Sequence, residues 1–397
     1  MNTSKFLLTL ATIALATACS NDNEAPKTFV GDSDVEIKLS IDSETGTRAS
    51  IESDGQGLFE ADSMGIFMLA TVDTDVNPNG QEIDWANNVH ALRLKNVAAN
   101  ARINPKRTAT DIVWADGQAR RYPMDNCYSY RFYGYYPRVE NGSVLVQDNN
   151  RIYVSFYGLD GTQDIIWGRS EGANPEDEHE KYRYSARYFC QEDYDSKVPS
   201  LTFEHKMLRM QFYIQGVEDE NAEESNKYVS ANIVSIDTIM IAEMPTRANL
   251  VIANLGNDEE DGTLYPEWRH GLADIGVRGE NDGPFEKTQV NNDDLIKVGQ
   301  PILLPVLDED AESAGITKYR IKIRLRNEVG DVFDDEKPIE LKVTSNSKFE
   351  AGKTYKVVLK IAGLKQVFIF EEAETNEDFK TVEDSVDPGQ SLVRKKR

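Results

Sequence analysis

The stretch Leu201-Thr-Phe-Glu-His-Lys-Met-Leu-Arg-Met-Gln-Phe-Tyr-Ile214 decides the fold class of this chain. Apolar and polar side chains alternate along much of it, and a period of two is typical of a β-strand with one face in a core. The stretch therefore predicts a long strand in a sheet.

Shorter segments with strand patterns lie on both sides of this stretch. They are Val35–Ile41, Ser63–Leu69, Tyr128–Tyr136, Ser143–Val146, Arg151–Phe156, Ile233–Ile241, Asn249–Ala253, Gln300–Val306, Tyr319–Leu325, Ile339–Val343 and Lys353–Ile361. Turn residues separate nearly all of them, and no segment has a sustained helical period; Gln81–Val97 is at best a short helix or loop. Many short strands with polar turns indicate an all-β protein built from β-sandwiches.

The N-terminus reads as an export signal. Lys5 precedes the apolar run Phe6–Ala18, which is shorter than the roughly 20 residues that span a bilayer. Small residues stand directly before Cys19, and this resembles the lipobox of bacterial lipoproteins, in which the cysteine is acylated. An ordinary signal peptide with a chance cysteine is the alternative. The acidic stretch Ser20–Glu24 resembles the surface-export signal of lipoproteins from gut and oral anaerobes.

The rest of the chain is too long for a single core and predicts two domains. The predicted segments are a signal peptide at 1–18, an acidic tether at 19–34, one sandwich at 35–198, a second at 199–363, and a strand and tail at 364–397. The predicted boundary, around residue 198, lies near the end of the polar stretch Ser170–Ser200. A second polar stretch, Asn254–Asp294, is expected to be a loop excursion.

Composition and motifs argue against several classes of function. The net charge of −24 excludes nucleic-acid binding, because the chain would be repelled by phosphate backbones. The four histidines form no zinc motif, and no nucleotide or hydrolase motif occurs, so neither a metal, a cofactor nor catalytic residues are expected. His205 is expected to be structural. The acidic segment Asn257–Gly262 is expected to be a solvated loop rather than a weak cation site. Cys127 and Cys190 are expected to be buried thiols, although an exported protein permits a disulfide between them.

Several segments, in this order, resemble the fimbrillin family. They are Thr47-Arg-Ala49, Leu58–Phe67, Ile112–Trp114, Tyr130–Pro137, Asp164–Gly168, Leu201–His205 and Gly352–Tyr355. The resemblance implies two tandem transthyretin-like β-sandwich domains. It also implies subunits that arrive as lipoproteins, lose their first strand to an arginine-specific protease, and receive a strand of another subunit in its place.

The resemblance assigns roles to three parts of the chain. The protease would cut between Arg48 and Ala49. The strand that leaves would carry Val35, Ile37, Leu39 and Ile41. The candidate donor strand contains Val367, Phe368, Ile369 and Phe370. An ordinary first strand that stays in place, and an ordinary last strand of the second sandwich, are the open alternatives.

The expected function is that of a pilus subunit or adhesin, displayed on the cell surface and held in the outer membrane by acylated Cys19. Its expected partners are other pilus subunits, in a homopolymer or heteropolymer, and a ligand on a host or bacterial surface. The stalk, anchor and tip roles stay open. The alternative is an unpolymerised, lipid-anchored glycan-binding protein, which surface exposure of Tyr130, Tyr133 and Trp167 would favour.

Overall fold

The computed structural model describes most of the chain from Gly31 to Asp378. The described residues are 31–41, 60–71, 83–106, 109–124, 128–148, 150–174, 176–177, 179–190, 198–217, 234–280, 283–291, 294–327, 332–334, 339–341, 349–363 and 366–378.

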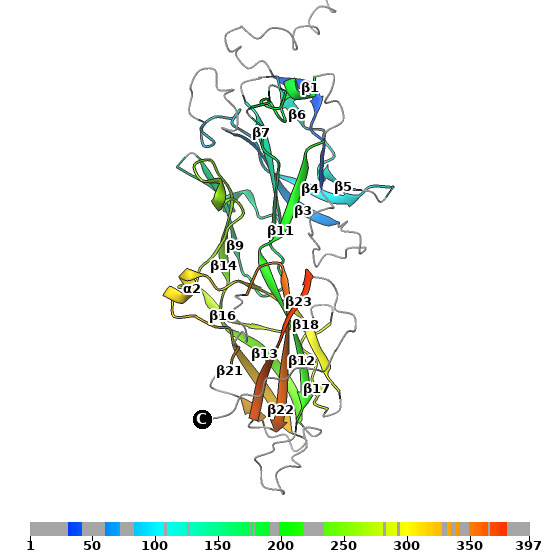
Figure 1. Ribbon diagram of the computed structural model, residues 1–397, viewed down its shortest axis with the longest axis vertical. Coiled ribbons are helices and arrows are strands. Elements are labelled where there is room, and N and C mark those ends of the chain that lie inside the picture. The colour runs from blue at the N-terminus through cyan, green and yellow to red at the C-terminus, as the bar shows by residue number, and fades with distance from the viewer. Residues whose placement is uncertain are drawn as a thin grey trace, which may run out of the picture.

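Nearly all regular structure in these residues is β, as the sequence predicts (Figure 1). The strands are β1 Asp32–Glu36, β2 Leu39–Ile41, β3 Ala61–Ala70, β4 Leu92–Ile103, β5 Thr110–Trp114, β6 Arg121–Pro123, β7 Tyr130–Tyr136, β8 Val144–Gln147, β9 Arg151–Tyr157, β10 Ile166–Ser170, β11 Ser200–His205, β12 Met207–Gly216, β13 Val234–Pro245, β14 Arg247–Asn254, β15 Leu264–Pro266, β16 Leu272–Gly276, β17 Thr288–Gln289, β18 Ile296–Pro305, β19 Arg320–Asn327, β20 Val332–Asp334, β21 Ile339–Glu340, β22 Lys353–Gly363 and β23 Gln366–Asp378. The short helices are α1 Ala186–Phe189 and α2 Glu309–Ser313, with 3-10 turns η1 Asn141–Ser143 and η3 Asp258–Glu260.

Seven strands close into a barrel in the upper lobe of Figure 1. Their order is β10-β11-β2-β5-β4-β3-β7, and β7 pairs back to β10. A second sheet, β15-β14-β9-β8, packs on the same hydrophobic core. Aromatic side chains are buried on both faces of β7: Tyr130, Phe132 and Tyr135 are each at most 1% exposed, and Tyr135 packs on Phe156 of β9.

The lower lobe consists of two sheets around a second core. One sheet has the order β18-β12-β22-β23 and the other β16-β13-β19-β20. Leu208, Met210, Phe212 and Ile214 on β12 point into this core and are fully buried.

The chain passes between the two cores in nearly continuous strands. Lys206 alone separates β11, which pairs in the barrel, from β12, which pairs in the lower lobe. Thr246 likewise separates β13 from β14. The two sandwiches and their predicted boundary near residue 198 stay a prediction, but the pairing of β11 with β10 and β2 keeps residues 200–205 with the upper core.

Three expectations for individual segments were wrong. The predicted long strand from residue 201 is two strands, because the backbone turns out of the barrel at Lys206. The region expected to end as a short helix or loop at Val97 contains the start of β4, a 12-residue strand. A bulge at Asn96, with φ of 51°, resets the alternation there, so the period of two is interrupted. The polar stretch 254–294, expected to be a loop excursion, contains β15, β16 and β17.

Candidate functional site

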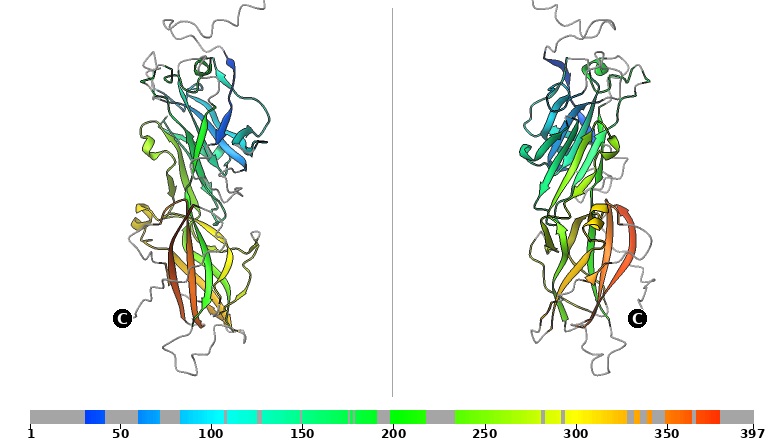
Figure 2. Two further views of the ribbon diagram at one scale, coloured as in Figure 1. Left: turned by 45° about the vertical axis from the view of Figure 1, so that its right-hand side comes forward. Right: turned by 90° about the vertical axis from the view of Figure 1, so that its left-hand side faces the viewer.

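The residues predicted to form a removable strand lie in the upper lobe as β1 and β2, drawn in blue in Figure 2. β2 is central rather than peripheral: it pairs antiparallel with β5, where Leu39 faces Ile112, and parallel with β11. Ile37, Leu39 and Ile41 are 1%, 3% and 4% exposed, and Val35 packs partly buried against the same core. The predicted apolar face therefore points into the barrel.

Backbone hydrogen bonds hold both segments along their length. The Ile37 amide donates to the Arg120 carbonyl at 2.8 Å and the Ser40 amide to the Pro199 carbonyl at 3.0 Å, while β1 pairs with β6. We call the space that β5, β6 and β11 form around residues 32–41 the first-strand slot. Without these residues, β5 and β11 would each present an unpaired edge beside an apolar trough.

Acidic side chains on the outer face of β1 meet two arginines at the rim of the slot. Asp32 forms an ion pair with Arg93. The Arg121 guanidinium donates to the Asp34 carbonyl at 2.7 Å and lies 4.0 Å from the Asp34 carboxylate. These groups are partly or largely exposed, so each pair stabilises the fold by only about 0–1 kcal/mol. Neither arginine could be predicted to lie here, because nothing in the local sequence links them to residues 32–34.

Three residues of the predicted processing pathway lie outside the described part of the chain. These are the lipidation site Cys19 and the cleavage pair Arg48 and Ala49. Cys127 also lies outside it. Cys190 is exposed at the C-terminal cap of α1, which corrects the expectation that it is buried.

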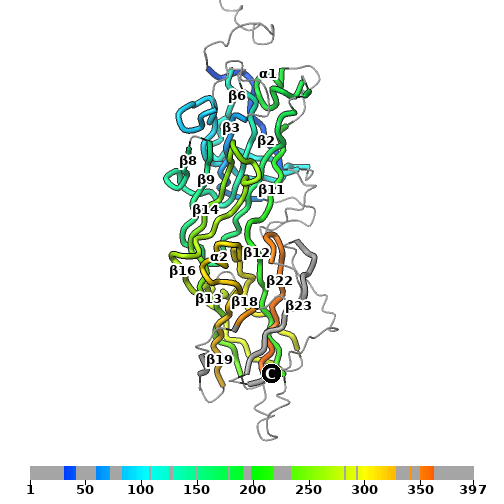
Figure 3. Tube along the Cα trace, turned by 60° about the vertical axis from the view of Figure 1, so that its left-hand side comes forward, coloured from blue at the N-terminus to red at the C-terminus, as the bar shows by residue number. Residues whose placement is uncertain are grey.

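The candidate donor residues Val367–Phe370 belong to β23. Its backbone pairs antiparallel with β22, from Lys353 opposite Asp378 to Gly363 opposite Gln366. Figure 3 shows β12 and β22 side by side. β23 follows β22 at the edge of this sheet. This arrangement corresponds to the alternative of a last strand, and the donor role stays a prediction.

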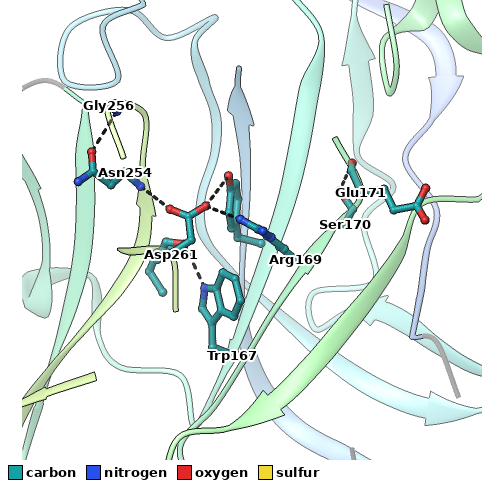
Figure 4. A network of polar contacts seen from close by, with 9 residues as sticks. Trp167, Arg169, Ser170, Glu171, Asn254, Gly256 and Asp261 are labelled. Carbon is teal, nitrogen blue, oxygen red and sulfur yellow. Dashed lines mark hydrogen bonds and ion pairs between the residues drawn. The ribbon is translucent and has the colours of Figure 1, made fainter. Parts of the chain in front are cut away.

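A buried polar network fixes the connection from β14 to β15 on the barrel (Figure 4). The Asp261 side chain is 1% exposed and accepts hydrogen bonds from the Asn254 amide at 2.7 Å, Arg169 at 3.1 Å and the Tyr133 hydroxyl at 3.3 Å. Burial raises the pKa of Asp261 to about 6, although the Asn254 amide and Arg169 oppose this shift. The expectation of a solvated acidic loop is therefore wrong for Asp261.

Trp167 provides the surface on which this connection rests. Its indole N–H donates to the Ile252 carbonyl at 3.0 Å. Gly262 has φ of 76°, and a Cβ there would come within 2.4 Å of the indole ring. Only glycine satisfies both the left-handed backbone and the close approach.

The aromatic residues considered for glycan binding are interior. Tyr130, Tyr133 and Trp167 are 1%, 3% and 5% exposed, so they form no sugar-stacking surface. His205 is buried too, and its Nδ1 lies 2.9 Å from the Asp164 carboxylate, in keeping with the structural role expected for it. Within the described residues, no group of three or more His, Cys, Asp and Glu side chains could hold a metal ion.

None of the helices in the described part of the chain has the length and hydrophobicity that a membrane crossing needs.

Comparisons with known proteins add the following findings. The family model described as fimbrillin-like matches residues 47–377. No curated protein matches the chain. A putative cell adhesion protein of Bacteroides uniformis is 15% identical, over 87% of this chain and 98% of that one, with a TM-score of 0.46. A fimbrial protein of Bacteroides vulgatus is 12% identical, over 85% and 98%, with a TM-score of 0.43. The fimbrial anchor protein Mfa2 of Porphyromonas gingivalis is 9% identical, over 85% and 96%, with a TM-score of 0.34.

Proposed function

Because the chain belongs to the fimbrillin-like family, we propose that it is a subunit of a surface fimbrium that accepts a strand from another subunit. It reaches the outer membrane as a lipoprotein acylated at Cys19. A protease then cuts after Arg48, and residues up to the cut leave with the lipid. The first-strand slot is thereby opened for a strand of the next subunit.

One observation carries this proposal: the first strand is short, central and apolar on its inner face. Three side chains, Ile37, Leu39 and Ile41, are at most 4% exposed in the barrel. Burying three aliphatic side chains contributes roughly 5–9 kcal/mol before ordering costs. A replacement strand would recover this contribution and the backbone hydrogen bonds of both slot edges.

The glycan-binding alternative lacks a comparable observation. Its three candidate aromatic residues are buried, as described above. The adhesive ligand of a fimbrial subunit, and the donor role of Val367–Phe370, remain part of the proposal.

N-terminal sequencing and intact mass of protein sheared from cell surfaces test the proposal. We expect a chain that begins at Ala49, in assemblies of high mass that resist SDS. A chain that always begins at acylated Cys19 and migrates as a monomer would contradict strand removal. Arg48→Gln is the matched variant: it should keep the full N-terminus and stay out of the assemblies.

A further inference from the structure

The first-strand slot has a defined requirement for three apolar side chains at alternating positions. Ile37, Leu39 and Ile41 occupy it, and each is nearly or fully buried. Leu39 lies opposite Ile112 on β5, and Ile41 lies between Thr110 on β5 and Leu201 on β11. An ionised side chain at any of these three positions would lose its water without gaining a partner.

The rim of the slot also favours a particular charge on the strand that occupies it. Arg93 and Arg121 lie at the end of the slot that β1 occupies, and Asp32 and Asp34 meet them from the outer face of the strand. A replacement strand with acidic residues at that end would restore the ion pair with Arg93 and the 4.0 Å contact with Arg121. The 2.7 Å hydrogen bond of Arg121 goes to a backbone carbonyl, which any strand can supply. One with basic residues there would place like charges together.

The C-terminal stretch of this chain fails the first requirement. Between residues 364 and 397, no three residues at alternating positions are all apolar. Every set of three alternating residues that includes two of the apolar residues Leu364 and Val367–Phe370 also contains Lys365, Gln366, Glu371 or Glu372. Val367 and Ile369 supply only two apolar positions on one face, and Phe368 and Phe370 only two on the other.

β23 also already has a neighbour in its own chain. Its backbone pairs antiparallel with β22, from Lys353 opposite Asp378 to Gly363 opposite Gln366. A move to another copy's slot would give up the backbone hydrogen bonds of this pairing.

We infer that the first-strand slot accepts a strand from a different protein, not β23 of a second copy. The partner strand has three aliphatic residues at alternating positions and acidic residues on its outer face at the end beside Arg93 and Arg121. This inference rests on the proposed function, because the slot must first be vacated. It makes the chain a member of a heteropolymer.

Peptide exchange into the intact chain tests the inference. A recognition site for a site-specific protease replaces residues 46–50, so that cleavage leaves residues 31–41 bound but free to exchange. Fluorescence anisotropy then measures the binding of two labelled peptides, residues 31–41 and residues 364–374. We expect the first to bind and the second to bind at least 30-fold more weakly. Mass photometry of the cleaved chain alone should show monomers.

The charge requirement has its own variants. Asp32→Asn with Asp34→Asn in the peptide, or Arg93→Gln with Arg121→Gln in the protein, should weaken binding of residues 31–41 several-fold and reduce its salt dependence. Arg320→Gln is the control, since Arg320 on β19 pairs with Glu243 in the lower lobe.

The outcomes separate the inference from the function on which it rests. Equal binding of the two peptides, or multimers of the cleaved chain that removal of residues 364–397 abolishes, would overturn the inference and leave strand acceptance intact. Failure of residues 31–41 to exchange at all would overturn both. Rim variants without effect would overturn the charge requirement.

Discussion

Two segments of the upper core, residues 32–41 and the β14–β15 hairpin, are held in different ways. Residues 32–41 are held by apolar burial, by backbone pairing and by ion pairs that are partly exposed, such as Asp32 with Arg93. The β14–β15 hairpin is held by a polar network whose central carboxylate, Asp261, is 1% exposed. Exposed pairs are weak and open readily to water, whereas buried networks are strongly coupled to the fold.

This difference indicates which segment the barrel can release. β14 also continues β13, so the hairpin is joined covalently and nearly without interruption to the lower core. The first strand has no such continuation among the described residues, which leave out 42–59 between β2 and β3. A single cut in that interval frees β1 and β2 but leaves the rest of the core connected.

The largest effect on stability is expected when the apolar contacts of the first strand are removed. Leu39→Asp places a carboxylate where the side chain is 3% exposed, and we expect the free energy of unfolding to fall by about 4 kcal/mol or more. Chemical denaturation followed by tryptophan fluorescence measures this loss. Lys38→Asp, at the exposed neighbouring position, is the control and should change stability by less than about 1 kcal/mol. Equal effects at the two positions would refute the slot geometry.

The second prediction concerns the contribution of Asp261 in the β14–β15 hairpin to the free energy of unfolding, and how this contribution depends on pH. The folded protein binds the Asp261 proton more tightly than the unfolded chain, because burial raises its pKa to about 6. This contribution is therefore fully present below about pH 4 and is lost as the pH rises through 6, by up to about 3 kcal/mol. In Asp261→Asn, the difference in unfolding free energy between pH 4.5 and pH 7.5 should shrink by about 2 kcal/mol, because part of the contribution is already lost at pH 4.5. Urea titrations at both pH values measure it, and an unchanged difference would contradict the assignment.

Local sequence patterns predicted the parts of this fold that depend on alternation. The all-β class follows from them, and the inward face of Ile37, Leu39 and Ile41 could be read directly from a period of two. The change from the upper core to the lower core at Lys206 is also visible in the sequence pattern. Leu201 and Phe203 before it are buried at odd positions, and Leu208 and Met210 after it at even ones.

Contacts between distant segments could not be predicted in this way. Asp261 sits in a run of acidic residues that looks solvated, and only the approach of Arg169 and Tyr133 from the barrel makes it interior. β4 could not be predicted for a related reason, because the bulge at Asn96 interrupts its alternation. The left-handed backbone of Asn96 is set by pairing with β3 and not by the residues beside it in the sequence.

The smallest effect on stability is expected from a substitution behind β11, one of the strands that form the slot. Gly134 on β7 lies beneath β11, and a Cβ there would approach Phe203 to 2.7 Å and Leu201 to 3.0 Å. Gly134→Ala must displace these two side chains, and overpacking of this kind costs about 1–3 kcal/mol. Leu201 also faces Ile41 across the slot, so the displacement should speed exchange of the first strand in the cleaved chain. Gly142→Ala is the matched control, because its Cβ would meet nothing within 4 Å. Gly134→Ala could instead lower stability but leave the exchange rate at the wild-type value. In that case Leu201 and Phe203 of β11 move without weakening the contacts of β2, and the prediction is wrong.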